Sequence, residues 1–322
     1  FDRYLAGAPQ DDPRRDSARK SLAEIRGVAA ATAMKENRDE AARAFRKEDF
    51  KTAEDLWRKV IAAKPDDTEA MYFHAKSLVG LDRKLDAYAA LRRFLSAERR
   101  ASARTDDAKK IVKDMENRLG DSEPARRKAN EGTALLDAGK WEEAIATFDE
   151  AVNIAPLRAD TWAERARALQ YAWAAEGRKD RLMEAIRDLE TALLVNERHG
   201  RSWSLLAVTK VNLEDWEGAV QAGIKSAQFD PGWQPGVEAR ARACGRTGRF
   251  AEAEQAATDG IGKFPSAVLH IARADARVGL GKLKEARTDL DAAEEKFKLT
   301  DFEKVYLSQV LDRYVRAQKA GQ

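Results

Sequence analysis

The residue types that most often carry catalysis or bind metals are scarce in this chain of 322 residues, which contains one cysteine and three histidines. Cys244 stands where a helical pattern calls for a small apolar residue, and we expect a buried, inert thiol rather than a nucleophile. His74, His199 and His270 lie far apart, and no pair of them has the spacing of metal ligands. These residues therefore predict neither a catalytic centre nor a metal site.

One short stretch, Gly279-Leu280-Gly281-Lys282, has the composition of a phosphate-binding loop. Such a loop follows a β-strand, and no strand pattern precedes this one, so we interpret it as a turn between helices. Asp and Glu residues are numerous, but on solvated helix faces they mainly support solubility and weak pairing. The sequence therefore predicts no enzymatic activity and no cofactor.

The composition is that of a soluble helical protein. Charged residues make up 35% and hydrophobic residues 43%, and no segment approaches the roughly 20 apolar residues of a membrane span. The net charge of +3 is too small for a chain of this length to indicate nucleic-acid binding. We expect a bacterial protein from its Ala, Arg and Asp content; a cytoplasmic location is favoured, with a periplasmic or envelope-associated one left open.

A periodic pattern of alanines organises the chain and defines the elements that carry its side chains. Their separations are 34, 57, 41, 34, 34 and 33 residues. Around each alanine, apolar residues recur at the spacing of one helix face. A step near 34 predicts a solenoid of stacked helix pairs. The alanines are Ala53, Ala87, Ala144, Ala185, Ala219, Ala253 and Ala286.

The residues around these alanines point to a known repeat. The stretch GKWEEAIATFDEAV over residues 139–152, followed by Pro156, closely resembles the tetratricopeptide repeat (TPR). Units that begin at Glu48, Glu214 and Gly248 fit the same pattern. The resemblance implies an all-α, right-handed superhelix of helix pairs. It also implies small residues where paired helices approach, at Gly132, Ala166, Ala207, Ala241 and Ala274.

The irregular steps predict local departures from the repeat. The 57-residue step leaves room for an extra helix over residues 107–119, with Ile111, Val112, Met115 and Leu119 on one face. Residues 17–34, with Leu22, Ile25 and Val28, resemble that extra helix. Residues 1–5 align with a second helix whose partner is absent, so we expect native sequence upstream of Phe1. The 41-residue step predicts two lengthened helices around a protruding turn at residues 177–180.

Three regions follow from this pattern. Residues 1–123 are predicted to form an N-terminal array with two enlarged three-helix units, and residues 124–298 a regular array. Residues 299–322 are predicted to form a capping helix, which the capping box from Thr300 to Glu303 opens. Asp312, Arg313, Arg316 and Lys319 are expected on its solvent side.

In TPR proteins the first helix of each pair lines a concave groove, and the resemblance places a set of mostly basic residues there. Arginine forks bind carboxylates bidentately, so an acidic peptide segment is the expected ligand, although an arginine-rich chain would also place basic residues there by chance. Trp173 is expected either near the protruding turn, in reach of a partner, or packed on Leu182 and Met183. The predicted groove residues are Lys76, Arg126, Arg167, Tyr171, Arg201, Asn212, Arg242 and Arg246.

Two functions of different class agree with these expectations. The first is a non-catalytic scaffold or adaptor that binds a protein partner in the groove. The alternative is the regulatory region of a larger enzyme, a kinase, protease or transferase, whose catalytic domain lies upstream. Binding of chaperone tails is disfavoured, because Ala129 and Thr133 stand where that TPR type needs Lys and Asn. RNA binding is disfavoured because no paired base-reading positions recur.

Overall fold

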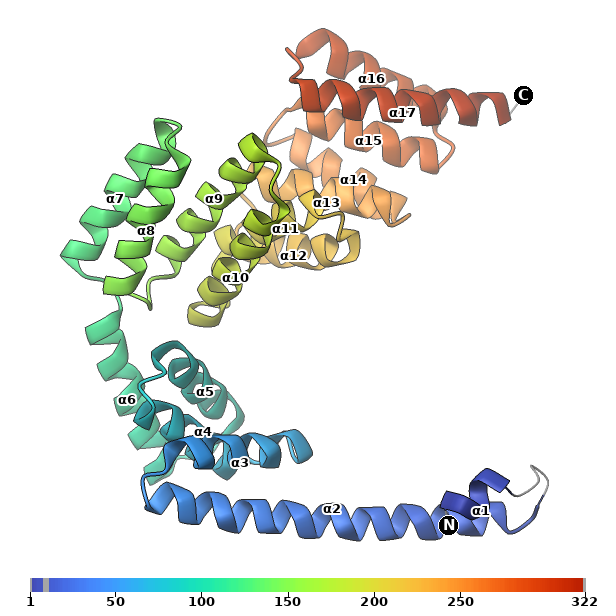
Figure 1. The fold of residues 1–322 in the computed structure, drawn as a ribbon. Coiled ribbons are helices and arrows are strands. Elements are labelled where there is room, and N and C mark those ends of the chain that lie inside the picture. The colour runs from blue at the N-terminus through green and yellow to red at the C-terminus, as the bar shows by residue number, and fades with distance from the viewer. Residues whose placement is uncertain (1, 8–11, 321–322) are drawn as a thin grey trace. The chain divides into compact units, whose positions relative to one another are not determined.

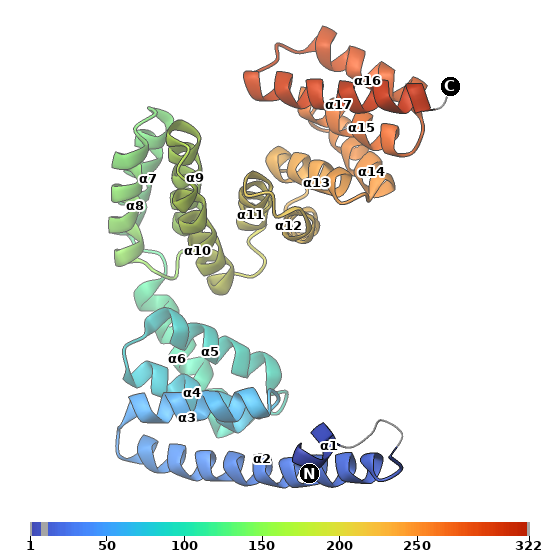
Figure 2. The same ribbon diagram turned by 45° about the vertical axis from the view of Figure 1, so that its right-hand side comes forward.

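The computed structural model describes residues 2–7 and 12–320, and these residues form seventeen helices and no strand (Figures 1 and 2). The predicted all-α class is confirmed. Among the described residues, no helix is both long enough and apolar enough to cross a membrane. The chain divides into two compact units, residues 1–117 and residues 118–322, which are taken in turn. The regional boundary expected at residue 123 stays a prediction.

Unit 1 consists of a short helix, a long helix and the helices that pack on it. The α2–α3 pair is followed by the α4–α5 pair. Side-chain hydrogen bonds join α6 to this second pair: Tyr72 of α4 donates to Asp107, and Tyr88 of α5 donates to Glu116. The helices are α1 (Asp2–Gly7), α2 (Arg15–Arg46), α3 (Phe50–Ala63), α4 (Thr68–Gly80), α5 (Lys84–Ala97) and α6 (Ala103–Leu119), the last of which ends inside unit 2.

Unit 2 contains five helix pairs and a final helix. Successive odd-numbered helices contact one another as well as their even-numbered partners, whereas successive even-numbered helices do not approach as closely. The odd-numbered helices therefore form the inner layer of the array. The helices are α7 (Glu123–Asp137), α8 (Trp141–Ile154), α9 (Ala159–Glu176), α10 (Lys179–Val195), α11 (Gly200–Asn212), α12 (Trp216–Phe229), α13 (Gln234–Arg246), α14 (Phe250–Ile261), α15 (Ala267–Gly279), α16 (Leu283–Lys296) and α17 (Asp301–Ala320).

The small residues of the repeat lie where helices cross. All seven alanines that set the period are at most 1% exposed. Ala166, Ala207, Ala241 and Ala274 on the facing helices are fully buried. At Gly132 the approach is closer still, since a Cβ atom there would lie 2.8 Å from the Phe148 ring. The predicted role of these residues in close helix approach is confirmed.

The turn inside each helix pair has a left-handed residue. Gly139, Gly248 and Gly281 have φ between 74° and 75°. In three other pairs a non-glycine residue takes the same conformation: Glu48, Asp82 and Glu214 have φ of 61°, 51° and 61°. Because side chains rarely adopt these angles, the packing of the two helices imposes the turn on the sequence.

The N-terminal segment differs from the sequence-based expectation. Residues 17–34 do not form a separate helix, because α2 runs without a break from Arg15 to Arg46. No proline falls between Met34 and Phe45, and the helix-forming residues there allow it to continue. Ile25 and Val28 are 55% and 69% exposed, so the predicted apolar stripe is not buried. Phe1, where the expected partial repeat begins, lies outside the described residues.

The other two irregular steps produce the predicted helices. Helix α6 covers residues 103–119 and buries Val112, with Ile111 and Met115 half-buried beside it. Helices α9 and α10 have 18 and 17 residues, against 13 and 14 in the next pair. Gly177, in the left-handed conformation, ends α9 at the exposed turn between them.

The C-terminal helix caps the array through α15 and α16. Its predicted capping box is present: the Glu303 backbone N–H donates to Thr300 Oγ1 at 3.3 Å, and the Thr300 N–H donates to the Glu303 carboxylate at 2.8 Å. The expectation for Arg313 was wrong. Its guanidinium forms an ion pair with the buried carboxylate of Asp275 on α15, because an unpaired charge would be costly there.

Two buried aspartates occupy the same position of two repeats, three residues after the repeat alanine. Asp289 receives hydrogen bonds from Arg273, Arg277 and His270; burial would raise its pKa, but these bonds and charges hold it below the usual value. Asp188 has only Arg165, at 3.4 Å, and its Oδ2 atom is buried without a hydrogen-bond partner. Burial therefore raises the pKa of Asp188 to about 7.

The contributions of the two aspartates to the free energy of unfolding should depend on pH in opposite directions. Folded Asp188 keeps its proton at pH values where the unfolded chain has lost it, so its contribution to stability falls as pH rises from about 4 to 7. We expect Asp188→Asn to increase the free energy of unfolding at pH 8, by up to about 4 kcal/mol, and to change it little at pH 4. Urea unfolding followed by circular dichroism at both pH values measures this.

Asp289→Asn is the matched control. The pKa of Asp289 is depressed, so its stabilising contribution is present above the unfolded pKa and is lost as pH falls through the folded one. Asp289→Asn should therefore destabilise the protein at pH 8 and much less in acid. If both variants changed the free energy of unfolding equally at pH 8, the different hydrogen-bond partners of the two aspartates would not explain their behaviour.

Candidate functional site

A polar cleft lies on the inner layer of unit 2, between α7, α9 and α11. Its volume is about 560 Å³, and most of the residues around it are polar or charged. The lining residues are Ala129, Asn130, Thr133, Asp137, Arg158, Asp160, Thr161, Glu164, Arg167 and Arg201. Arg167 and Arg201, two of the predicted groove residues, therefore lie at one site.

Glu164 neutralises both of these arginines. Arg167 Nη2 lies 2.7 Å from one carboxylate oxygen of Glu164, and Arg201 Nη2 lies 2.5 Å from the other. Glu164 is 8% exposed, and the Arg201 guanidinium also lies over the Trp233 ring at 5.4 Å. The positive charge of these two side chains is thus largely committed to an internal carboxylate.

The cleft still has polar atoms without a protein partner. Among the described residues, Thr161 Oγ1, Arg158 Nη1 and the Nε atoms of Arg167 and Arg201 are buried and accept or donate no hydrogen bond. Buried polar atoms are usually paired, so these atoms are available to a polar group that enters the cleft. Asp160 at the cleft edge is paired with His199 at 3.1 Å, and that hydrogen bond lowers the pKa of Asp160.

Thr133 stands where the chaperone-binding TPR type has an asparagine, but its hydroxyl does not take over the role of that asparagine. Its hydroxyl donates to the backbone oxygen of Ala129, one turn earlier, at 3.0 Å. A hydroxyl committed to its own helix is not directed at a ligand.

Arg242 and Arg246 on α13 have a different environment. The Arg242 guanidinium lies over the rings of Phe302 and Tyr306 on α17, at 4.7 Å and 5.3 Å. The Arg246 guanidinium lies 4.9 Å from the Trp216 ring centre. Among the described residues, no carboxylate oxygen lies within 4.0 Å of either side chain, and each guanidinium rests on aromatic rings.

Burial affects the α13 arginines and their neighbours. It lowers the pKa of Arg242, although an arginine remains protonated at neutral pH. It also raises the pKa of Asp275, against the effect of the paired Arg313 and the more distant Arg246. Burial raises the pKa of Tyr306 too, so its hydroxyl stays neutral. This end of the inner layer therefore carries exposed and half-buried positive charge with little local compensation.

The remaining predicted groove residues are dispersed. Arg126 on α7 is paired with Asp121 at 2.5 Å. Lys76 belongs to α4 in unit 1, where it lies 3.1 Å from Asp107. Asn212 ends α11 and is half-buried.

Two aromatic residues predicted for binding lie on α9. Tyr171 is 46% exposed and stacks on Trp141 at 5.1 Å. Trp173 is half-buried, four residues before the turn at Gly177.

The sequence-based prediction of groove residues did not include the residues that determine which arginines have an acidic partner. Glu164 follows the i, i+3 spacing with Arg167, so that pair could have been recognised from the sequence. The ion pair of Glu164 with Arg201 joins different repeats, and so does the contact of Arg242 with the Phe302 ring. No local sequence pattern indicates either contact.

The side chains near these arginines have the following chemistry. The described residues contain no group of three or more His, Cys, Asp or Glu side chains that could hold a metal ion. Cys244 is buried, and burial raises the pKa of its thiol, which makes it a poor nucleophile. Guanidinium groups held against aromatic rings are suited to planar carboxylates.

Comparisons with known proteins yield one partial relative. No family model matches the chain. The heat-shock protein cognate (HSC) co-chaperone sgt12 of Aspergillus fumigatus is 27% identical over 101 residues, which are 31% of this chain and 28% of that relative. The match thus spans less than a third of the relative's length.

Several solved structures have a similar arrangement of helices. The TPR protein TTC0263 of Thermus thermophilus has a TM-score of 0.45 and 17% identity, covering 58% of this chain and 98% of its own. A TPR protein of Parabacteroides merdae has a TM-score of 0.42 and 15% identity, covering 87% and 99%. PilF of Pseudomonas aeruginosa has a TM-score of 0.48 and 17% identity, covering 61% of this chain and 88% of its own.

The predicted repeat pattern agrees with the helices of unit 2. Its repeat alanines are buried at the helix crossings, the preceding turns are left-handed, and unit 2 consists of five helix pairs and a final helix. This helical-repeat fold resembles that of tetratricopeptide-repeat proteins.

Proposed function

We propose that this chain is a non-catalytic scaffold or adaptor that holds an acidic segment of a partner protein on the inner layer of unit 2, at Arg242 and Arg246. The observation that carries the proposal is the difference between two groups of arginines. Arg167 and Arg201 share Glu164, whereas Arg242 and Arg246 have aromatic rings and no carboxylate.

Aromatic stacking prepares these two guanidinium groups for a ligand. A ring that contacts the flat face of a guanidinium restricts the side chain but leaves the N–H groups at its edge free to donate. A carboxylate can then accept two parallel hydrogen bonds without displacing an internal partner. Because Arg242 is half-buried, that bond would form in surroundings where charge is less screened than in bulk water.

Short acidic segments fit this surface better than a continuous polyanion. Glu238 on α13 lies on the same layer as the two arginines and would repel an unbroken row of phosphates. A peptide can place a single carboxylate at each arginine. We therefore propose a protein partner and expect no nucleic acid.

The partner proposed here is not a chaperone tail. The partial relative is by its name an HSC co-chaperone, and chaperone tails are acidic ligands of some TPR domains. In this chain the corresponding positions carry Ala129 and a Thr133 whose hydroxyl is bonded to its own helix. The alternative of a regulatory region in a larger enzyme stays a prediction.

Reversal of one exposed charge should weaken binding of acidic peptides. We expect Arg246→Glu to reduce affinity for a fluorescein-labelled pool of Asp- and Glu-rich peptides by about tenfold, because it replaces a charge-assisted hydrogen bond with repulsion. Arg242→Lys should also weaken binding, since a lysine keeps the charge but loses the fork geometry. Fluorescence anisotropy titrations measure both affinities.

Arg126→Glu is the matched control, because Arg126 lies on the same layer but is already paired with Asp121. Its affinity for the acidic pool should remain close to that of the unmodified protein. A lysine-rich pool should not bind. If Arg126→Glu and Arg246→Glu weakened binding equally, general electrostatic attraction would replace the proposed site.

Removal of the internal carboxylate should have two opposite effects. Glu164→Gln leaves Arg167 and Arg201 without their anionic partner, so the free energy of unfolding should fall by about 1–3 kcal/mol. The same variant should bind the acidic pool more tightly, because two further guanidinium groups become available. Urea unfolding and anisotropy titrations measure the two effects, and unchanged affinity would exclude the α7–α11 cleft from binding.

A further inference from the structure

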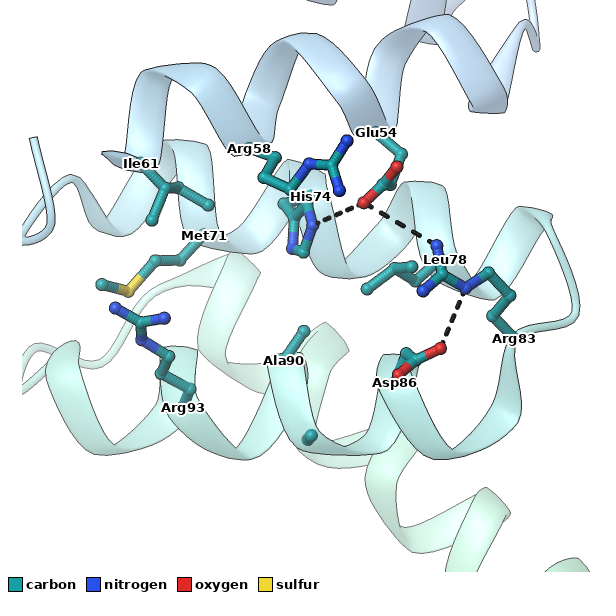
Figure 3. Close-up of a pocket in the computed structure, with 11 residues that line it drawn as sticks. Glu54, Arg58, Ile61, Met71, His74, Leu78, Arg83, Asp86, Ala90 and Arg93 are labelled. Atoms are coloured by element: carbon teal, nitrogen blue, oxygen red, sulfur yellow. Dashed lines mark hydrogen bonds and ion pairs between the residues drawn. The ribbon is translucent and has the colours of Figure 1, made fainter. Parts of the chain in front are cut away.

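Unit 1 has a separate pocket on α3, α4 and α5 that the inner-layer site does not include (Figure 3). Its volume is about 380 Å³, within the range of sites that bind small groups or single side chains. Helices α3 and α5 form its two walls, and α4 lies between them at its base.

The middle of the pocket is apolar. Met71 and Leu78 of α4 are buried below it, and Ile61 of α3 forms one side. On the α5 side the lining residues are Ala89 and Ala90, whose small side chains leave the space open. An aliphatic side chain that entered would replace water against these surfaces, which is favourable.

One end of the pocket is closed by a saturated polar network. Glu54 Oε1 lies 3.2 Å from His74 Nε2 and 3.8 Å from Arg83, and Arg83 donates to Asp86 at 2.9 Å (Figure 3). Burial lowers the pKa of His74, so its neutral ring can donate through Nε2 to Glu54. With the His74 ring neutral, Glu54, Arg83 and Asp86 together carry one net negative charge, so this end of the pocket does not attract an anion.

The other end carries a free cation. Figure 3 shows Arg93 of α5 at the end where Ile61 and Met71 lie, opposite the Glu54 network. Among the described residues, no carboxylate lies within 4.0 Å of Arg93, whereas Arg58 on the facing wall is paired with Asp55 at 2.5 Å. The pocket thus combines an apolar interior with one uncompensated positive charge at its rim.

We propose that this pocket receives an aliphatic side chain of a partner peptide and that a carboxylate on the adjacent residue binds Arg93. The size and apolar lining of the pocket suit the aliphatic group, and the unpaired guanidinium of Arg93 can bind a carboxylate beside it. The site lies on different helices from Arg242 and Arg246, so it does not depend on the function proposed for unit 2.

The test measures how tightly the full chain binds labelled peptide pools of equal length. One pool has Glu-Leu fixed at its centre and variable flanks, a second has Lys-Leu, and a third has Glu-Ser. The background is Arg246→Glu, which we expect to weaken binding of acidic peptides to unit 2. We expect the Glu-Leu pool to bind about tenfold more tightly than either of the others by fluorescence anisotropy.

Two variants locate this binding in the pocket. Ala90→Phe fills the cavity and Arg93→Glu reverses the rim charge, and each should weaken binding of the Glu-Leu pool by about tenfold. The matched controls are Ala97→Phe, at an exposed position of the same helix, and Arg99→Glu, an exposed arginine just beyond it. Both controls should leave binding unchanged.

Arg93 is exposed, so its variant tests the proposal even if Ala90→Phe fails to fold. The proposal is wrong if the Glu-Leu and Lys-Leu pools bind equally, or if Arg93→Glu binds as Arg99→Glu does. Binding that survives in the Arg246→Glu background but disappears with Arg93→Glu supports the pocket whether or not unit 2 binds acidic peptides.

Discussion

Close approach of helix axes at small buried residues is the constraint on which the rest of this structure depends. The repeat alanines and their partners on facing helices, such as Ala219 and Ala207, are almost completely buried. No pair of short helices could bury its apolar stripe alone, so stability comes from stacking of neighbours. Because the crossing recurs at each repeat, side chains at equivalent positions of successive inner helices lie in register. Ion pairs between repeats then become possible.

Register between repeats determines which charges are neutralised. Arg201 of α11 reaches Glu164 of α9, and Arg313 of α17 reaches Asp275 of α15, because each acid lies one inner helix earlier. Arg242 of α13 instead lies over the rings of Phe302 and Tyr306 on α17. Although the net charge is only +3, the unpaired charges are distributed unevenly. Most cationic side chains of the inner layer have an acidic partner, and a few do not.

The elements of the fold were predictable, whereas the state of the site was not. Helix identity and the crossing alanines follow from local spacing, and they agree with the structure from Ala53 to Ala286. The continuous α2 was missed because the repeat pattern suggested a break that the helix-forming residues after Met34 do not provide. The predicted arginines have the right helices, but their partners lie in other repeats, and one sequence contains no direct signal for such pairs.

The same reasoning explains why uncompensated arginines mark binding surfaces better than the number of arginines does. A guanidinium with an internal carboxylate must lose that partner, or share it, before it can bind another anion, and the exchange yields little free energy. Arg242 and Arg246 keep their N–H groups available while aromatic rings hold them in place. In a solenoid whose inner layer is rich in both acids and bases, the proposed specificity for an anion would thus arise where the pairing between repeats is incomplete.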